Sequence, residues 1–457
     1  MYWEQRIRFA AISDTGSRRQ NNQDAFVVRL APTREDWAGR GHLFVVADGM
    51  GGHAVGELAS KMAIDVVPHT FEKLRQLHPF KALQQAVETA NQRIHERGKL
   101  NQEFLRMGTT CSALLLGPQG AFVAHVGDSR VYRIRQQIID QLTRDHSLVW
   151  ELVEQRRIKP KDADRLFPRN VITRSLGPEA TVQVDLEGPT PVQPGDIFVL
   201  CTDGLSSVVH DEEIGALASE LSPDAAAQAL VHLANLRGGP DNITVIVVHV
   251  GEVPQHAETT ELPIYETPAS GSWGTFVFFC VLSVIGLTGL TLLLLTEHRW
   301  FGGLLLGGVF LGGVGWWLSR PRPAAQQSGE RNAESTIIWR PYRTASARLT
   351  PPFVMQMGRY LESLMKAAEE EGWPVAWNVC QQHYQAGQQA LVKKHYAHAL
   401  RHFCDTINLL LQTQAGESGT GRGVGRTGRE GKSTISDKTS HGKAPASSSQ
   451  PPDLATS

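Results

Sequence analysis

The chain has 457 residues, with 45 Lys and Arg against 46 Asp and Glu, and five cysteines. This length exceeds one ordinary domain and suits two or three units. The balanced charge excludes a global electrostatic attraction to nucleic acid, and the scattered cysteines, with no C-x-x-C pair, favour buried thiols over a zinc or disulfide framework. The N-terminus has no long apolar core and no cleavage-site pattern, so we expect no signal peptide.

The first part of the chain, about residues 7–250, has the pattern of a globular unit of strands and helices. Apolar, strand-like runs bounded by Gly, Pro, Asp or Asn cover residues 7–13, 25–30, 42–47, 111–117, 121–126, 131–134, 197–201 and 243–250. Helical spacing covers residues 57–77, where Pro68 would kink or divide the helix, then 81–98 and about 224–236. Because strands come in runs, a mostly antiparallel layered fold is favoured over a doubly wound parallel sheet.

Four acidic residues stand beside glycine or another small residue near the ends of such runs: Asp48, Asp128, Asp203 and Asp241. A single aspartate in this position is commonly a turn residue or a helix cap. Four in one domain indicate a cluster that holds two or more hard cations. Oxygen-only sites of this kind favour Mg²⁺ or Mn²⁺ over Zn²⁺. The carbonyl of Gly49 is a further candidate ligand, since glycine lets the backbone approach a cation closely.

This ligand set predicts a reaction. Two hard cations roughly 3.5–4 Å apart would activate a shared water for in-line attack. Arg18 and Arg19, in a loop that precedes the second strand, could hold a phosphoryl group by bidentate hydrogen bonds. The chemistry predicted is hydrolysis of a phosphomonoester by a metal-activated water, with no phosphoenzyme intermediate.

Eight motifs occur along this region in the order SDTGSRRQNNQDAF, VVADGMGGHAVGELAS, MGTTCSALLL, AHVGDSRVYRIR, QLTRDHSLV, NVITRSLG, GDIFVLCTDGLSSVV and GGPDNITVIVV. Together they resemble the metal-dependent serine/threonine protein phosphatases of the PP2C-type (PPM) family in its bacterial form. The resemblance covers about residues 7–251. It implies an α+β fold, a four-layer α-β-β-α sandwich, for residues 1–251. It also implies a protein-serine/threonine phosphatase, a phosphoric monoester hydrolase, that uses two or three Mn²⁺ or Mg²⁺ ions.

The resemblance assigns metal ligands residue by residue. Asp48 would bridge two cations, and the Gly49 carbonyl would bind one of them. Asp203 and Asp241 would hold the second cation, and Asp128 a third. Asp48 and Asp203, together with the phosphate-binding Arg19, therefore count as catalytic residues.

The resemblance also implies residues that bind the phosphate or support the ligands. Arg19 would bind the phosphate, with Arg18 as its nearest rival. The residues implied to lie behind the ligands and to hold metal-bound waters are Asp14, Gln23, Asp24 and Asn242. A variable flap beside the cleft would lie within residues 143–176.

The sequence departs from the family pattern at two positions. Gln23 stands where many members have Glu, which removes one negative charge near the metals. Met50 stands near the position where animal members carry a His proposed as the general acid. The proton donor is therefore either His53 or a metal-bound water, and the sequence does not choose between them.

After a polar linker, residues 252–272, two uncharged apolar stretches follow within residues 273–318, at about 275–296 and 301–318. They have about the ~20 residues that a bilayer span needs, and tryptophans stand at their ends. A buried helical hairpin is the alternative. Arg320 and later arginines favour the cytoplasm for the C-terminal flank, and the short loop puts the N-terminal domain there too. We expect a multi-pass protein of the bacterial inner membrane, with a two-helix transmembrane hairpin.

The remaining chain is predicted to be a connector (residues 319–351), a small helical region (352–413) and a disordered Gly- and Ser-rich tail (414–457). Residues 378–412 resemble one tetratricopeptide-type helix pair. An ordinary amphipathic helical hairpin is the alternative. This region is a candidate docking module for substrates or partners.

These features predict a membrane-anchored phosphatase that acts on phosphoserine and phosphothreonine proteins and opposes Ser/Thr kinases. The alternative is a catalytically silent, membrane-tethered module that binds phosphoproteins. Intact Arg19, Asp48, Asp203 and Asp241 argue against it, since a degenerate domain could lose any of them.

Overall fold

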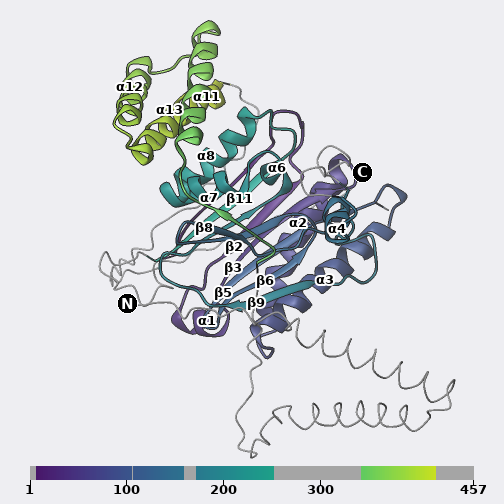
Figure 1. The fold of residues 1–457 in the computed structure, drawn as a ribbon. Coiled ribbons are helices and arrows are strands. Elements are labelled where there is room, and N and C mark those ends of the chain that lie inside the picture. Colours follow the sequence, from purple (N-terminus) through teal and green to yellow (C-terminus); the bar gives the residue numbers. More distant parts are fainter. Residues whose placement is uncertain (1–6, 105, 159–170, 252–340, 418–457) are drawn as a thin grey trace, which may run out of the picture. The chain divides into compact units, whose positions relative to one another are not determined.

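The computed structural model describes residues 7–104, 106–158, 171–251 and 341–417, and two antiparallel sheets form its centre (Figure 1). The first sheet has the order β1 (Ile7–Asp14), β11 (Ile243–Val250), β10 (Ile197–Cys201), β7 (Arg130–Arg135), β8 (Ile138–Gln141) and β12 (Arg343–Ser346). The second has the order β2 (Asp24–Arg29), β3 (His42–Met50), β5 (Cys111–Gly117), β6 (Gly120–Val126) and β9 (Asp185–Thr190), with β4 (Gly108–Thr109) paired to β3.

The two sheets enclose one apolar layer. Since side chains alternate along a strand, Phe44 and Val46 of β3 enter this layer, while Val45 and Ala47 join the cluster beneath the helices on the other face. From the first sheet, Phe198 and the other inward residues of β10 and β11 fill the same layer. Continuous apolar strands therefore mark a sandwich that is covered on both sides.

One outer layer consists of α2 (His53–Lys73) and α3 (Pro79–Lys99). Pro68 is predicted to kink or divide the first of these helices, but it does not divide it, because α2 runs through Pro68 without a break. Ala63 and Phe71, on either side of the proline, are both buried in the same cluster. Packing of both halves against one sheet outweighs the hydrogen bond that Pro68 removes.

The other outer layer consists of α7 (Asp211–Glu220) and α8 (Pro223–Leu236), which pack on the first sheet. Ser222 caps α8 by accepting a hydrogen bond from Ala225 N, and Pro223 occupies its first turn. The four-layer α-β-β-α sandwich expected for residues 1–251 is thus present.

Several short elements carried no clear signal in the sequence. They are β4, β8, β9, β12, α1 (Arg34–Gly39), the 3₁₀ turn Gln102–Phe104, α4 (Leu148–Glu154) and α6 (Asp203–Ser206). All of them have seven residues or fewer, too few to show a clear period.

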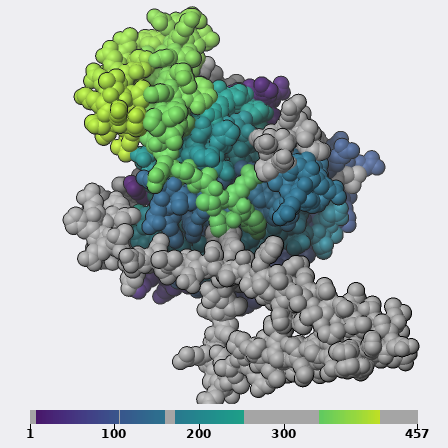
Figure 2. Space-filling view, in the orientation of Figure 1, coloured from purple at the N-terminus to yellow at the C-terminus, as the bar shows by residue number. Residues whose placement is uncertain are grey.

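The segment predicted as a connector, residues 319–351, contains an edge strand of the sandwich. β12 pairs antiparallel with β8 in the register Thr344↔Asp140, and the Thr344 hydroxyl donates to the Asp140 carboxylate at 2.8 Å. Ala347 N donates to Gln137 O at 2.8 Å. In the space-filling view, the green residues of this segment lie across the blue and teal surface of the sandwich (Figure 2).

Three helices follow: α11 (Pro351–Glu370), α12 (Trp377–Val392) and α13 (Tyr396–Glu417). The last two occupy the stretch where the sequence predicts a helix pair. Their apolar faces join the cluster beneath α7 and α8 through residues such as Val354 and Phe403. Arg401 Nε donates to Glu220 O at 3.2 Å. The C-terminal helices and the sandwich therefore form one compact unit.

Within the described residues, no helix combines the length and apolarity needed to cross a bilayer. The two predicted spans, 275–296 and 301–318, lie outside those residues, as do the linker before them and most of the predicted tail.

Candidate metal centre

The predicted ligands meet at one edge of the sandwich. Asp48 lies near the end of β3, and β2 begins opposite it in the register Asp24↔Asp48. Asp203 follows β10 as the first residue of α6, and Asp241 lies two residues before the start of β11. Asp128 lies in the turn between β6 and β7. Strand ends from both sheets thus gather five carboxylates.

The carboxylates perturb one another. Burial, followed by the charges of Asp24 and Asp203, raises the pKa of Asp48 well above its usual value. Burial is also the largest cause that raises the pKa of Asp24 to about 7 and that of Asp203 to about 6. Burial and the charge of Asp203 raise the pKa of Asp128. In each case burial outweighs the interactions that favour the ionised form, and a bound cation relieves this condition.

Buried oxygen atoms in this cluster also lack partners. Within the described residues, Asp24 Oδ1, Asp128 Oδ1 and Asp203 Oδ1 are buried and accept no hydrogen bond. An ionised carboxylate only accepts, so each such oxygen needs a donor or a cation. Oxygen ligands with this much negative charge fit hard divalent cations. The residues present therefore fit the metal ions that the sequence implies.

Hydroxyl groups that the sequence analysis missed hold the carboxylate of Asp24 and the backbone of Asp48. The Thr202 hydroxyl donates to Asp24 Oδ2 at 2.8 Å and itself accepts from Thr244 N at 3.0 Å. The Thr110 hydroxyl accepts from Asp48 N at 2.9 Å. Since Thr110 follows a two-residue strand, no periodic signal could have marked it.

His146 positions the turn that carries Asp128. Gly127 N donates to His146 Nδ1 at 3.0 Å, so Nε2 carries the proton and donates to Asp185 at 2.9 Å. His146 N also donates to Gly127 O at 2.7 Å. The sequence analysis gave this histidine no role.

Gly49 lies where two chain segments touch. A Cβ at this residue would be 2.0 Å from Gly56 O and 2.7 Å from Gln23 O, so a side chain does not fit. Gly49 N donates to Gln23 O at 3.1 Å. This contact fixes the backbone beside Asp48 and leaves Gly49 on the wall of the cavity described next.

Arg19 faces the carboxylates across a cavity of about 570 Å³ that Asp48, Asp203 and Asp241 also line. Its Nη2 lies 2.7 Å from Asp241 Oδ2, and 51% of its side chain is exposed. The guanidinium therefore has donors left for an incoming anion. Its rival Arg18 is not among the described residues that line the cavity.

Asp14, Gln23, Asp24 and Asn242, the four residues predicted to support the metal ligands, lie around those ligands and the loop that carries Arg19. Asn242 accepts from Gln23 N at 2.8 Å and donates to Thr15 O at 2.8 Å and Asn21 O at 3.0 Å. It is 4% exposed, so it fixes the loop that carries Arg19 from the inside.

The other supporting contacts are local. Asp14 accepts from Gly16 N at 2.9 Å and Asn235 Nδ2 at 3.1 Å, and Gln23 Nε2 donates to Gly52 O at 2.8 Å. Gln23 and Met50, the two departures from the family pattern, both line the cavity. His53, the candidate proton donor, begins α2, and its side chain is outside the described atoms.

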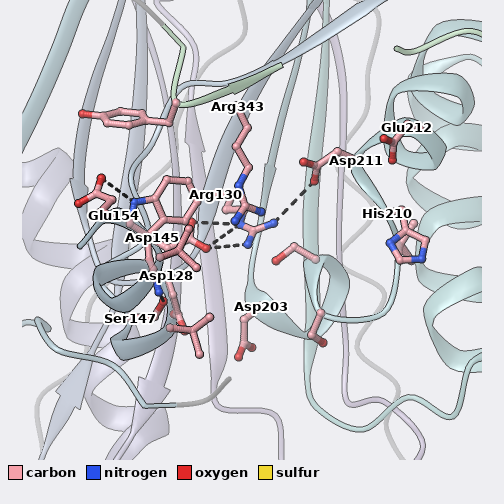
Figure 3. A pocket seen from close by; sticks show the side chains of 17 residues that line it. Asp128, Arg130, Asp145, Ser147, Glu154, Asp203, His210, Asp211, Glu212 and Arg343 are labelled. Atoms are coloured by element: carbon pink, nitrogen blue, oxygen red, sulfur yellow. Dashed lines mark hydrogen bonds and ion pairs between the residues drawn. The ribbon is translucent and has the colours of Figure 1, made fainter. Parts of the chain in front are cut away.

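A second cavity, of about 520 Å³, shares Asp203 with the first and is also lined by Asp128 (Figure 3). Arg130 spans its floor, with Nε and Nη2 donating to the Asp145 carboxylate at 2.6–3.0 Å. The Arg343 guanidinium carbon, from β12, lies 4.4 Å from the centre of the Trp150 ring of α4.

The predicted flap therefore contributes α4, with Trp150, to the wall of the second cavity. Val171 and Ile172 of the same flap line the first cavity, and residues 159–170 lie outside the described residues. β12 completes the wall with Tyr342 and Arg343. That contribution could not be seen in the sequence.

The family model of protein phosphatase 2C matches residues 16–234. A putative protein phosphatase 2C-type protein of Streptococcus pyogenes is 39% identical over 249 residues, which are 53% of this chain and 97% of that protein. The chain belongs to the protein phosphatase 2C family.

A further protein and a crystal structure are also similar to this chain. Serine/threonine protein phosphatase PstP of Mycobacterium tuberculosis is 36% identical over 247 residues, which are 53% of this chain and 45% of that protein. A crystal structure of the PstP catalytic domain in complex with two manganese ions is 33% identical, with a TM-score of 0.45, and the match covers 54% of this chain and 99% of that one. As a family member with its carboxylates intact, the chain is a protein-serine/threonine phosphatase.

Proposed function

We propose that this phosphatase is a membrane-anchored enzyme that hydrolyses phosphoserine and phosphothreonine in proteins, with Mn²⁺ or Mg²⁺ as cofactor and no phosphoenzyme intermediate. The observation that carries the proposal is the cluster of buried carboxylates with unpaired oxygens opposite Arg19. A catalytically silent module would have no need to keep such mutually repelling groups in place.

The residues that would hold two or three cations are Asp48, the Gly49 carbonyl, Asp128, Asp203 and Asp241. When bound, the cations supply a water of lowered pKa as nucleophile and neutralise charge on the phosphoryl oxygens.

Arg19 would bind and orient the phosphate through guanidinium donors that its ion pair with Asp241 does not use. That ion pair sets the position of the guanidinium, and Asn242 fixes the loop beneath it. Together they would hold a bound phosphate on the side of the cavity that faces the carboxylates.

Direct attack by water is supported by the residues that line the first cavity. Among the described residues there, none is Cys, Ser or His. The thiols of Cys111 and Cys201 are buried, and burial raises the pKa of each to about 12. Among the described residues of this cavity, a thiolate nucleophile is therefore not available.

The test of the mechanism is hydrolysis of a phosphothreonine peptide in ¹⁸O-labelled water under single-turnover conditions. The proposal predicts one labelled oxygen in each released phosphate and no phosphorylated protein after acid quenching. A phosphorylated protein would contradict it. Peptide binding without any release, at saturating Mn²⁺, would favour the silent binding module.

We propose that residues 275–296 and 301–318 anchor the enzyme in the inner bacterial membrane, with the phosphatase domain in the cytoplasm, where it would oppose Ser/Thr kinases. The support is their length, lack of charge and flanking tryptophans. Deletion of residues 273–318 should move the protein from the membrane to the soluble fraction. Full-length protein found in the soluble fraction would refute the anchor.

The C-terminal region is proposed to select substrates through the second cavity. Arg343 and Trp150 form one wall of it, and Asp203 connects it to the first cavity. Arg343→Ala should change the preference among phosphopeptides and leave hydrolysis of a small aryl phosphate unchanged. Equal effects on both substrates, or no effect on either, would contradict this role.

A further inference from the structure

A second cluster of potential metal ligands lies far along the chain from the carboxylate centre, where α12 packs against α13. His383 on α12 and His402 and Asp405 on α13 each offer one ligand atom, and these atoms lie within 4.8 Å of one another. No other trio of His, Cys, Asp or Glu among the described residues brings its ligand atoms so close.

The spacing of the two histidines agrees with a shared ion. His383 Nδ1 and His402 Nδ1 face each other at 3.4 Å. Two nitrogen ligands about 2.0–2.1 Å from a tetrahedral zinc ion lie roughly 3.3–3.4 Å apart. Asp405 follows His402 by three residues, so both project from one face of α13. The helices thus present two imidazole nitrogens and one carboxylate oxygen to a single point.

The packing of the two helices holds this arrangement in place. Gly387 lies one turn after His383, and a Cβ there would be 2.5 Å from the Phe403 ring and 3.3 Å from His402 Cβ. The absent side chain lets α13 approach α12 at the level of the trio. Phe403 is fully buried, while Asp405 is exposed, so the site is fixed on its inner side and open to water on its outer side.

We propose that His383, His402 and Asp405 form a zinc site that joins α12 to α13, with water as the fourth ligand. The ligand chemistry separates it from the phosphatase centre, because imidazole suits zinc and carboxylate oxygens alone suit Mg²⁺ or Mn²⁺. Bound zinc stabilises the C-terminal helices that pack against α8. The proposal does not depend on the proposed catalytic function.

The test measures zinc bound by the full chain, purified in detergent, after Zn²⁺ is added and excess is removed by gel filtration. Because the carboxylate centre can also bind zinc, the result is the difference between parent protein and variant. His383→Gln and His402→Gln should each lose one zinc ion per chain and the rise in melting temperature that Zn²⁺ produces. His398→Gln, an exposed histidine on the same helix, should lose neither.

Mn²⁺-dependent phosphatase activity should survive in all three variants, which shows that they are folded and that the carboxylate centre is intact. Unchanged zinc content in His402→Gln would overturn the proposal, as would equal loss in His398→Gln. If His402→Gln loses activity through misfolding, Asp405→Asn, an exposed change, replaces it and should also lower the affinity for zinc.

Discussion

Removal of the Asp203 charge should stabilise the protein when no metal is bound. Burial and the neighbouring charge of Asp241 raise the pKa of Asp203 from 3.8 to about 6. At a pH above both values, a difference of this size destabilises the folded state by about 3 kcal/mol, at about 1.4 kcal/mol for each tenfold step. Asp203→Asn removes that cost, and loses about 0.5 kcal/mol from the favourable charge at the start of α6.

The sign of this stability difference follows from which state, folded or unfolded, binds the Asp203 proton more tightly. The folded state of the parent holds the Asp203 proton more tightly than the unfolded state does. The stability of the parent relative to the variant is therefore highest near pH 4 and is lost as the pH rises to about 6. Above that pH the variant should be the more stable protein by about 2.5 kcal/mol, or about 5–10 °C in melting temperature.

The assay is thermal unfolding of parent and Asp203→Asn in a chelator from pH 4 to pH 8. His125 and His249, whose pKa values burial lowers to about 4, weaken both proteins equally as the pH falls, so the difference between the proteins is compared. Saturating Mn²⁺ should reverse the order, since only the parent keeps its ligand set. A variant that is less stable at pH 8 without metal, or a difference independent of pH, would refute the reasoning.

Three further changes test other parts of the account. Arg19→Lys should lower kcat/KM for a phosphothreonine peptide about 10–100-fold, because lysine cannot form bidentate hydrogen bonds with the phosphate. The melting temperature should not change, and a large loss of stability would contradict the role of Arg19. Asn242→Ala should cost about 3 kcal/mol of stability and raise KM, because it leaves three backbone groups unpaired; a neutral result would contradict its positioning role. Gly215→Ala should lower the melting temperature, because the new Cβ would lie 2.6 Å from Ala347 Cβ, although Ala is the better helix former. Gly39→Ala is the control: a Cβ there would have nothing within 4 Å, so this change should be neutral or stabilising.

The sandwich could be predicted from the sequence because its strands are long, apolar and buried. β5, β6 and β10 are buried at every residue, and β11 at all but one, so burial on both faces shows directly as continuous apolar runs. The strand-end aspartates were visible for the same reason, since a charge that ends such a run interrupts the pattern.

The remaining features depend on contacts that no local pattern records. β12 has the sequence RTAS, with no apolar alternation, and is recognised only by its backbone pairing with β8. Arg130 and Asp145 are brought together by the β7–β8 hairpin. His146 reaches Gly127 and Asp185 from a loop. Their partners lie at least fifteen residues away along the chain and depend on the finished fold.

The most direct test of the central claim is phosphate release from a phosphothreonine peptide by the full chain, since β12 and α11–α13 belong to the folded unit and a shorter fragment would remove an edge strand. Release should depend on Mn²⁺ or Mg²⁺, stop in a chelator, and be lost in Asp48→Asn and Asp203→Asn while Arg343→Ala retains it. Release that continues in a chelator, or that survives either aspartate variant, would contradict a phosphatase built on this carboxylate centre.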